Sequence, residues 1–295
     1  MQAAYIKYVM ALILFGTNGI VASKIYMNSY EIVFWRTLIG SAFLLSIFLI
    51  TRKTGVFKSK KEGKHFSFVI LSGIAMGASW MFLYEAYVQM GVGMASLTYY
   101  CGPVIVMGLS PILFQEKMTW GKVVGLTGAL VGLLLTNGMD VVSKGLNSGL
   151  VFGLFSALMY AFMVIFNKKA TTIVGLENVV IQLFFSFVTV AVFLLWKAGT
   201  VEPVEAGNLA PLVFLGFVNT GVGCYLYFSS INWLTASFVS IIGYLEPLSA
   251  LLFSALLLQE RLTWIQGLGA VFIIGGGLFS ELYRREKRIS DAETY

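Results

Sequence analysis

The stretch Ser96–Trp120, SLTYYCGPVIVMGLSPILFQEKMTW, has a second copy 144 residues later at Ser240–Trp264, SIIGYLEPLSALLFSALLLQERLTW. The two copies align without a gap, so Pro103 matches Pro247, and each ends in the same Gln-Glu-x-x-Thr-Trp box. Beyond the box, Gly125 and Gly132 match Gly269 and Gly276. The chain is therefore two copies of one unit, which we expect at residues 1–140 and 141–295.

The composition identifies lipid as the solvent of this chain. Of its residues 58% are hydrophobic and only 12% are charged, whereas a soluble domain has about 25% charged residues. The net charge of +6 does not indicate nucleic acid as a partner, because the basic residues are confined to short loops and the C-terminal tail. We expect the partners to be a lipid bilayer and a small molecule.

The chain contains ten apolar segments of roughly the length that a helix needs to cross the hydrocarbon. None alternates in the manner of a barrel strand, so we expect an all-α integral membrane protein with ten transmembrane helices. The first segment continues too far to be a cleavable signal core. The segments are 4–22, 30–50, 66–88, 92–114, 118–137, 147–167, 176–196, 209–230, 235–258 and 262–283.

The placement of lysine and arginine predicts the orientation. With the N-terminus in the cytoplasm, fifteen basic residues lie on the inner side and four on the outer side, and Arg36 lies within a span. This is a strong positive-inside bias, and it places both termini in the cytoplasm. Each half then has five spans, an odd number, so the second half is inverted relative to the first. Inverted repeats of this kind are typical of secondary transporters.

The matched prolines, Pro103 and Pro247, each remove a backbone hydrogen bond within an apolar segment. Each should kink its helix and leave a carbonyl, that of Tyr99 or Gly243, free to face a cavity. One interpretation is a pair of hinges beside a central site. The alternative is that prolines are simply common in membrane helices.

Glu246 lies close to the middle of its predicted span, where a charge costs about 2.5–3.5 kcal/mol. Its counterpart in the first half is Gly102, so the repeat breaks its symmetry here. A carboxyl in a low-dielectric interior favours its neutral form, so it could bind and release a proton. It could also pair with a cationic substrate, or remain neutral and hydrogen-bond a neighbouring helix.

Arg36 and Glu85 lie at equal predicted depth in the outer half of the second and third spans. Pairing is the usual arrangement for charges inside a membrane, so we expect an ion pair. The pair would serve as an outer gate, or Arg36 would receive a substrate carboxylate. Alternatively the pair is structural, or Arg36 extends outward to the interface.

Aromatic and amide side chains are the other candidates for lining a cavity. Trp80, Tyr84 and Tyr87 recur at helical spacing and should share one face, suited to planar or cationic groups. Interfacial anchoring, ordinary packing and helix–helix hydrogen bonding are the alternatives. The candidate substrate contacts are Asn18, Trp35, Arg36, Trp80, Tyr84, Glu85, Tyr99, Tyr100, Tyr160, Gln182, Tyr244 and Glu246.

Repeated small residues and the repeated box indicate scaffold. The glycines at 121, 125, 128 and 132 share one side of the fifth span, which permits close contact with the tenth. In the box, Thr119 and Thr263 are natural N-caps, and Glu116 and Glu260 place negative charge near the start of the helix that follows.

These motifs together resemble the drug/metabolite transporter superfamily, specifically EamA-domain permeases. The resemblance runs from about residue 5 to residue 283 and includes "EIVFWR" in the second span and "YLEP" in the ninth. It implies transport of small metabolites across a bacterial inner membrane, often export of amino acids or related compounds. The second half departs from the first where Gln182 replaces the arginine, which argues against an equivalent ionic role.

The sequence thus predicts an alternating-access transporter and not an enzyme. An uncoupled facilitator of aromatic metabolites and a membrane-embedded binding or sensor protein are the alternatives. We expect no cofactor, with a proton gradient as the candidate energy source, and a monomer or homodimer. No metal site is expected, since the lone His65 has no second ligand nearby, and Cys101 and Cys224 should be reduced thiols.

Overall fold

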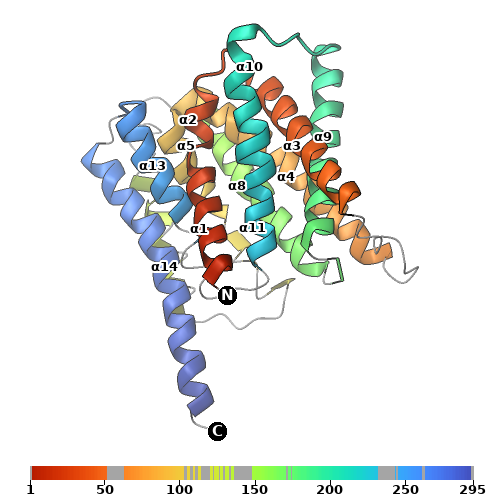
Figure 1. The fold of residues 1–295 in the computed structure, drawn as a ribbon. Coiled ribbons are helices and arrows are strands. Elements are labelled where there is room, and N and C mark those ends of the chain that lie inside the picture. The colour runs from red at the N-terminus through yellow and green to blue at the C-terminus, as the bar shows by residue number, and fades with distance from the viewer. Residues whose placement is uncertain are drawn as a thin grey trace.

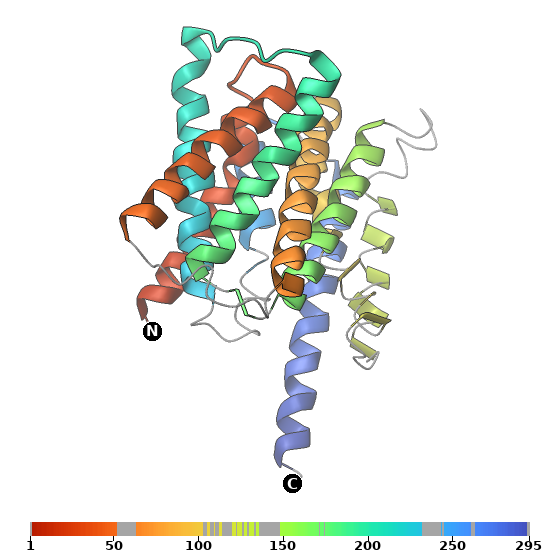
Figure 2. The ribbon, with the colours of Figure 1, turned by 90° about the vertical axis from the view of Figure 1, so that its right-hand side faces the viewer.

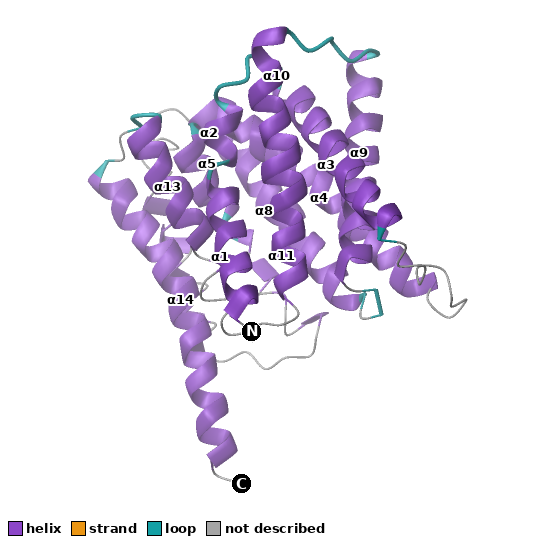
Figure 3. Cartoon of the chain, in the orientation of Figure 1, coloured by secondary structure: helices purple, strands orange, loops and turns teal. Residues whose placement is uncertain are grey.

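The computed structural model consists of helices, and no strand occurs among the residues that it describes (Figure 3). These are residues 2–51, 63–102, 148–170, 172–173, 175–231, 243, 245–260 and 263–293, with scattered residues between 105 and 135. The helices are α1 (Gln2–Gly16), α2 (Asn18–Ala22), α3 (Ser29–Ile50), α4 (Gly63–Met90), α5 (Val92–Tyr99), α8 (Ser148–Lys169), α9 (Gly175–Ala198), α10 (Ala206–Val213), η2 (Phe214–Val222), α11 (Gly223–Ile231), α13 (Leu245–Leu257) and α14 (Trp264–Glu293). The element η2 is a π-helix that continues α10 into α11.

Six helical segments in the described residues are long and apolar enough to cross a membrane. They coincide with six of the ten expected spans, and shorter apolar helices fall within three others. The all-α class is confirmed, whereas the number of ten spans stays a prediction. The six segments are Gln2–Ala22, Ser29–Ile50, Gly63–Met90, Ser148–Lys169, Gly175–Lys197 and Ala206–Tyr227.

The outside of the bundle is apolar, and several polar side chains are buried inside it. Trp264 is 89% exposed and Ile50 is 79% exposed, whereas Arg36 and Thr37 are among the most deeply buried residues. A soluble monomer rarely exposes large apolar patches. This inverted distribution fits a surface that is solvated by lipid chains.

Contacts between the two halves come in equivalent pairs: where a helix of the first half packs on one of the second, the corresponding helix of the second half packs on the corresponding one of the first. Helix α3 of the first half packs on η2 of the second, and α9 of the second half packs on α4 of the first. In the same way α1 packs on α13, and α8 packs on α5. Since α3 corresponds to α9 in the sequence repeat, and α1 to α8, these exchanges are those expected of duplicated halves.

Glycines make the close contacts that the sequence predicts. A Cβ on Gly132 would lie 2.6 Å from the carbonyl oxygen of Gly269, and one on Gly128 would lie 3.3 Å from the Cα of Gly276. Helix α14 therefore packs on the helical residues around Gly128 and Gly132 through glycine faces, as expected of scaffold helices.

The two ends of the bundle differ. In Figures 1 and 2 the start of α1 and the end of α14 lie at the same end, and α14 extends beyond the other helices there. The loop that joins α9 to α10 lies at the opposite end (Figure 1). This arrangement is compatible with an even number of membrane crossings.

Candidate functional site

Arg36 on α3 is the centre of the candidate site. Its side chain is only 1% exposed, yet its guanidinium group contacts neutral partners from three other elements. Nε donates to the hydroxyl of Thr220 at 3.0 Å, and one terminal nitrogen donates to the amide oxygen of Asn18 at 3.4 Å. The other terminal nitrogen donates to the Tyr84 hydroxyl. The group is therefore fixed in position without a contacting carboxylate among the described residues.

One face of α4 supplies aromatic rings to the guanidinium. The charged carbon of Arg36 lies 4.5 Å from the centre of the Trp80 ring and 5.1 Å from that of Tyr84. The structure thus brings together two residues that helical spacing places on one face. Cation–π contacts of this kind stabilise a desolvated cation by about 2 kcal/mol, which offsets part of the cost of burying Arg36.

The first span is broken beside this cluster. Helix α1 ends at Gly16 and α2 begins at Asn18, and the intervening Thr17 donates its hydroxyl to the carbonyl of Leu14 at 2.7 Å. The Leu14 carbonyl here accepts the Thr17 N–H at 3.0 Å, three residues on, and the next residue, Asn18, accepts from Arg36. Broken helices at membrane depth commonly border ligand sites.

Asn219 and Thr220 on the π-helix are two site residues that the sequence analysis missed. The Asn219 amide nitrogen donates to the carbonyl of Leu14 at 3.0 Å, to the Thr17 hydroxyl at 2.9 Å and to Asn18 at 3.1 Å. Its amide oxygen is buried and has no partner in the described part of the chain. π-Helical segments often occur at functional sites. The available signal was this polar pair within the apolar stretch 209–230.

The expected ion pair between Arg36 and Glu85 does not form. Glu85 accepts hydrogen bonds from Ser29 at 2.5 Å and from Gln89 at 2.9 Å, while Arg36 has the neutral partners described above. Equal depth in the membrane does not fix the direction of a side chain around its helix. Glu85 therefore pairs with neutral groups and not with Arg36.

Glu246 lies in a group of tyrosines contributed by both halves. The Tyr100 side chain is among the groups that act on its carboxyl group. Tyr99 packs edge-on against Tyr100 and Tyr160, with ring centres 5.1 and 5.2 Å apart. Glu246 also interacts electrostatically with Arg36. The structure thus places a carboxyl group and a guanidinium group within electrostatic reach of each other, without direct contact.

The remaining candidates take other roles or lie outside the described residues. Gln182 is buried and joins helices: its oxygen accepts from Ser72 at 2.8 Å, and its nitrogen donates to Asn178 at 2.6 Å. Trp35 packs edge-on against Phe34 in an apolar cluster, with its indole N–H buried and unpaired among the described residues. Tyr244 and Pro103 lie outside the described residues, as does the side chain of Pro247. The two hinges stay a prediction.

The box residue Glu260 joins the two halves at the end of the bundle opposite the chain termini. Its carboxylate accepts the backbone N–H groups of Val92 at 2.9 Å and Gly93 at 2.8 Å, and so caps α5. The expectation that it serves the following helix was wrong, because Thr263 and Gln266 cap that helix themselves with reciprocal bonds of 2.9 and 3.3 Å. Gly91, with φ of +81°, brings the chain close to the carboxylate.

Replacing Glu260 with alanine should lower the free energy of unfolding by about 2 kcal/mol, because two N–H groups lose charge-assisted hydrogen bonds. Thr263→Ala removes only a local cap and should cost about 1 kcal/mol. Thermal unfolding of the purified protein in mild detergent measures both. A melting temperature for Glu260→Ala equal to that of the wild type would contradict this role.

Comparison with known proteins identifies the class. The profile of the EamA-like transporter family matches the chain twice, over residues 2–138 and 147–281. An uncharacterized transporter of Bacillus subtilis, YxxF, is 26% identical over 99% of this chain and 94% of its own length. A probable amino-acid metabolite efflux pump of Salmonella typhimurium is 26% identical over 68% of this chain and 72% of its own. One solved crystal structure has the same fold, with a TM-score of 0.65 at 17% identity, covering 96% of this chain and 99% of its own.

Proposed function

The chain belongs to the EamA-like transporter family, and from this premise we propose that it exports a small, amino-acid-like metabolite by alternating access. A member of this family is a multi-pass membrane transporter and not an enzyme. The family is named for transport, and the substrate class follows here from the site. The relative named as an amino-acid metabolite efflux pump supports both the substrate class and the direction.

One observation supports the proposal most directly. Arg36 is buried and held in place, and some of its N–H donors have no partner among the described residues. A guanidinium group has five N–H donors, and the structure assigns three of them to Thr220, Tyr84 and Asn18. The two that remain match a carboxylate, the usual bidentate partner of arginine. The substrate carboxylate would therefore complete the coordination of Arg36, with Trp80 and Tyr84 beside it.

Glu246 is the candidate for the second charge of a zwitterion or for a coupling proton. Its position within electrostatic reach of Arg36 suits a substrate that carries an ammonium group close to its carboxylate. If Glu246 instead takes a proton as the substrate leaves, then the proton gradient drives export. Both roles require a carboxyl group that changes partner during the transport cycle.

Alternating access would use the duplicated halves, 1–140 and 141–295, as two inverted sets of five spans with both termini in the cytoplasm. The exchanged helix contacts, the common end of the two termini (Figure 1) and the excess of basic residues on the inner side support this topology. The cell inner membrane is then the proposed location.

Reconstituted vesicles test the proposal. We expect saturable counterflow of at least one of the twenty L-amino acids, and none of the matching decarboxylated amine, since the amine lacks the group that Arg36 binds. An absence of flux for all amino acids, from protein that is folded by thermal melting, would overturn export and favour a binding protein. Net efflux that persists unchanged after the proton gradient is dissipated would identify an uncoupled facilitator.

A further inference from the structure

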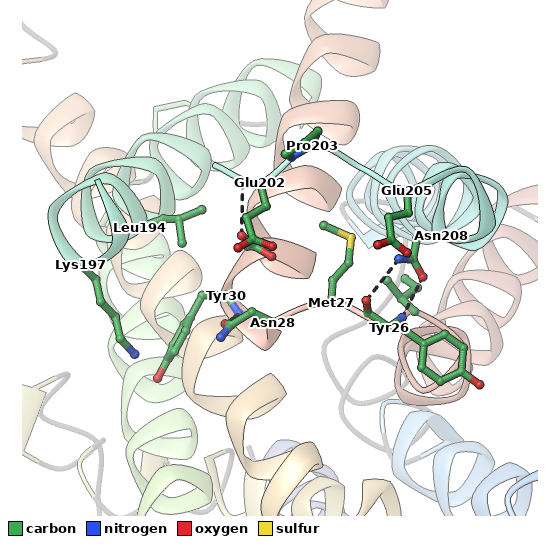
Figure 4. Close-up of a pocket in the computed structure, with 12 residues that line it drawn as sticks. Tyr26, Met27, Asn28, Tyr30, Leu194, Lys197, Glu202, Pro203, Glu205 and Asn208 are labelled. Carbon is green, nitrogen blue, oxygen red and sulfur yellow. Dashed lines mark hydrogen bonds between the residues drawn. The ribbon is translucent and has the colours of Figure 1, made fainter. Parts of the chain in front are cut away.

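A polar cavity lies at the end of the bundle opposite the chain termini, apart from the Arg36 cluster. It has a volume of about 710 Å³, within the range of sites that hold small molecules. Its walls come from the loop before α3, the end of α9, the α9–α10 loop and the start of α10 (Figure 4). The Asn208 side chain joins α10 to the loop before α3: its amide accepts from the Tyr26 N–H at 2.8 Å and donates to the Tyr26 carbonyl at 3.2 Å.

Three carboxylates and one lysine line this cavity: Glu31, Glu202, Glu205 and Lys197. Glu31 is the deepest, with only 7% of its surface exposed. One of its oxygens accepts a long hydrogen bond of 3.4 Å from the backbone of Glu202, and the other has no partner in the described residues. A carboxylate so buried and so poorly paired favours the arrival of a cation.

The lysine does not neutralise these acids. The Lys197 ammonium lies 4.2 Å from the centre of the Tyr30 ring and 5.9 Å from that of Phe193. Within the described part of the chain it forms no ion pair with the cavity carboxylates. The cavity therefore has excess negative charge. The Tyr30 ring, which can bind a cation, is covered by the Lys197 side chain, and an incoming ammonium ion can displace it.

Helix dipoles explain part of this charge but not all of it. Glu31 lies in the first turn of α3, and Glu205 directly precedes α10, and both positions favour acidic residues. Glu202 lies in the α9–α10 loop, outside any helix, and its backbone N–H donates to the Glu31 carboxylate. Helix capping gives no reason for placing a third carboxylate beside a buried one.

We propose that this cavity is a binding site for a small organic ammonium ion, with Glu31 and Glu202 as its counter-charges and Tyr30 as its aromatic wall. The site is separate from Arg36 and does not require the transport cycle to bind. A role in transport, in which ammonium-bearing substrates bind this outer cavity as well as the Arg36 site, is the one part that rests on the proposed function.

Calorimetric titration of the purified protein with phenethylamine hydrochloride tests the assignment. The titration uses the Glu246→Gln background, which removes the other candidate carboxylate. Glu31→Gln and Glu202→Gln should each weaken binding about tenfold, because each removes one counter-charge. Lys197→Ala should strengthen binding about threefold, since it frees the Tyr30 ring and removes a like charge.

The controls separate this site from the rest of the protein. Glu177→Gln, at the other end of α9, should leave phenethylamine affinity unchanged. Neither phenylacetate nor sodium chloride, at equal ionic strength, should compete with phenethylamine. Wild-type affinity in Glu31→Gln and Glu202→Gln, weaker binding in Lys197→Ala, or full competition by sodium would each overturn the proposal. Amino-acid counterflow tests the transport proposal independently.

Discussion

Replacing Arg36 with glutamine should weaken binding of the transported amino acid roughly 100-fold. The two unused N–H donors of Arg36 are available to the substrate carboxylate, and each charge-assisted bond contributes about 1.5 kcal/mol. Together they amount to about 3 kcal/mol, or roughly two factors of ten in affinity. Ligand-induced thermal stabilisation or calorimetry with the amino acid found in the flux screen measures the change.

A structural role of Arg36 predicts a different pattern. Arg36 also holds Thr220, Tyr84 and Asn18 together, so its loss could loosen the bundle and affect every ligand equally. The decarboxylated amine distinguishes the two roles, because it lacks the carboxylate and should bind the variant and the wild type alike. Equal losses for the acid and the amine would assign Arg36 to structure alone.

Two further variants define the geometry that the carboxylate needs. Arg36→Lys keeps the charge but lacks the planar fork, so it should recover only part of the lost affinity. Thr220→Val keeps the shape and removes the hydroxyl that positions Nε, and it should weaken binding about tenfold. Full activity in Arg36→Lys would show that charge alone suffices.

The sequence anticipates features that depend on local periodicity. Trp80 and Tyr84 share a face because they are four residues apart on a helix, and both rings contact Arg36. The spacing of the small residues likewise predicts that Gly128 and Gly132 meet a partner helix closely, and the structure confirms it. In both cases the helical period alone determines which residues lie together.

The partners of Arg36 depend on tertiary structure, and the sequence analysis did not find them. Thr220 is 184 positions away, and depth in the membrane cannot choose between it and Glu85. Hydropathy averaged over the first span also hides the break at Thr17, although the stretch Gly-Thr-Asn-Gly at 16–19 interrupts the apolar run. Local sequence does not predict the π-helix, Phe214–Val222, that orients Asn219.

In the repeated Gln-Glu-x-x-Thr-Trp box, the sequence predicts the capping threonine correctly but assigns the glutamate to the wrong helix. Its threonine caps the local helix as predicted. The same cap uses Gln266 in place of the glutamate, which leaves Glu260 to reach α5 in the other half. Local capping rules identify which side chains accept hydrogen bonds, but tertiary packing decides which helix provides the donors.

Replacing Glu246 with glutamine should abolish the pH dependence of transport. Among the described residues, Glu246 is the carboxyl group whose surroundings include both the tyrosine cluster and Arg36. Glutamine keeps the size and the hydrogen bonding of the neutral acid but cannot release a proton. Counterflow at a series of pH values, and net efflux driven by an imposed pH gradient, measure the effect.

Two control variants separate proton coupling from substrate binding. Tyr100→Phe removes a hydroxyl near the carboxyl group but keeps the titrating residue, so flux should still depend on pH with a displaced midpoint. Glu85→Gln makes the same chemical change in a carboxyl group that bonds Ser29 and Gln89 instead, and the pH profile should not move.

The combined outcome decides how the two charges of the site work. If Glu246→Gln loses net efflux driven by the gradient but retains amino-acid counterflow, then the carboxyl group carries the coupling proton while Arg36 binds the substrate. If counterflow is lost as well, and affinity falls for both the amino acid and its amine, then Glu246 binds the substrate ammonium. An unchanged pH profile would exclude proton coupling through this residue, because no titration of Glu246 would then limit transport.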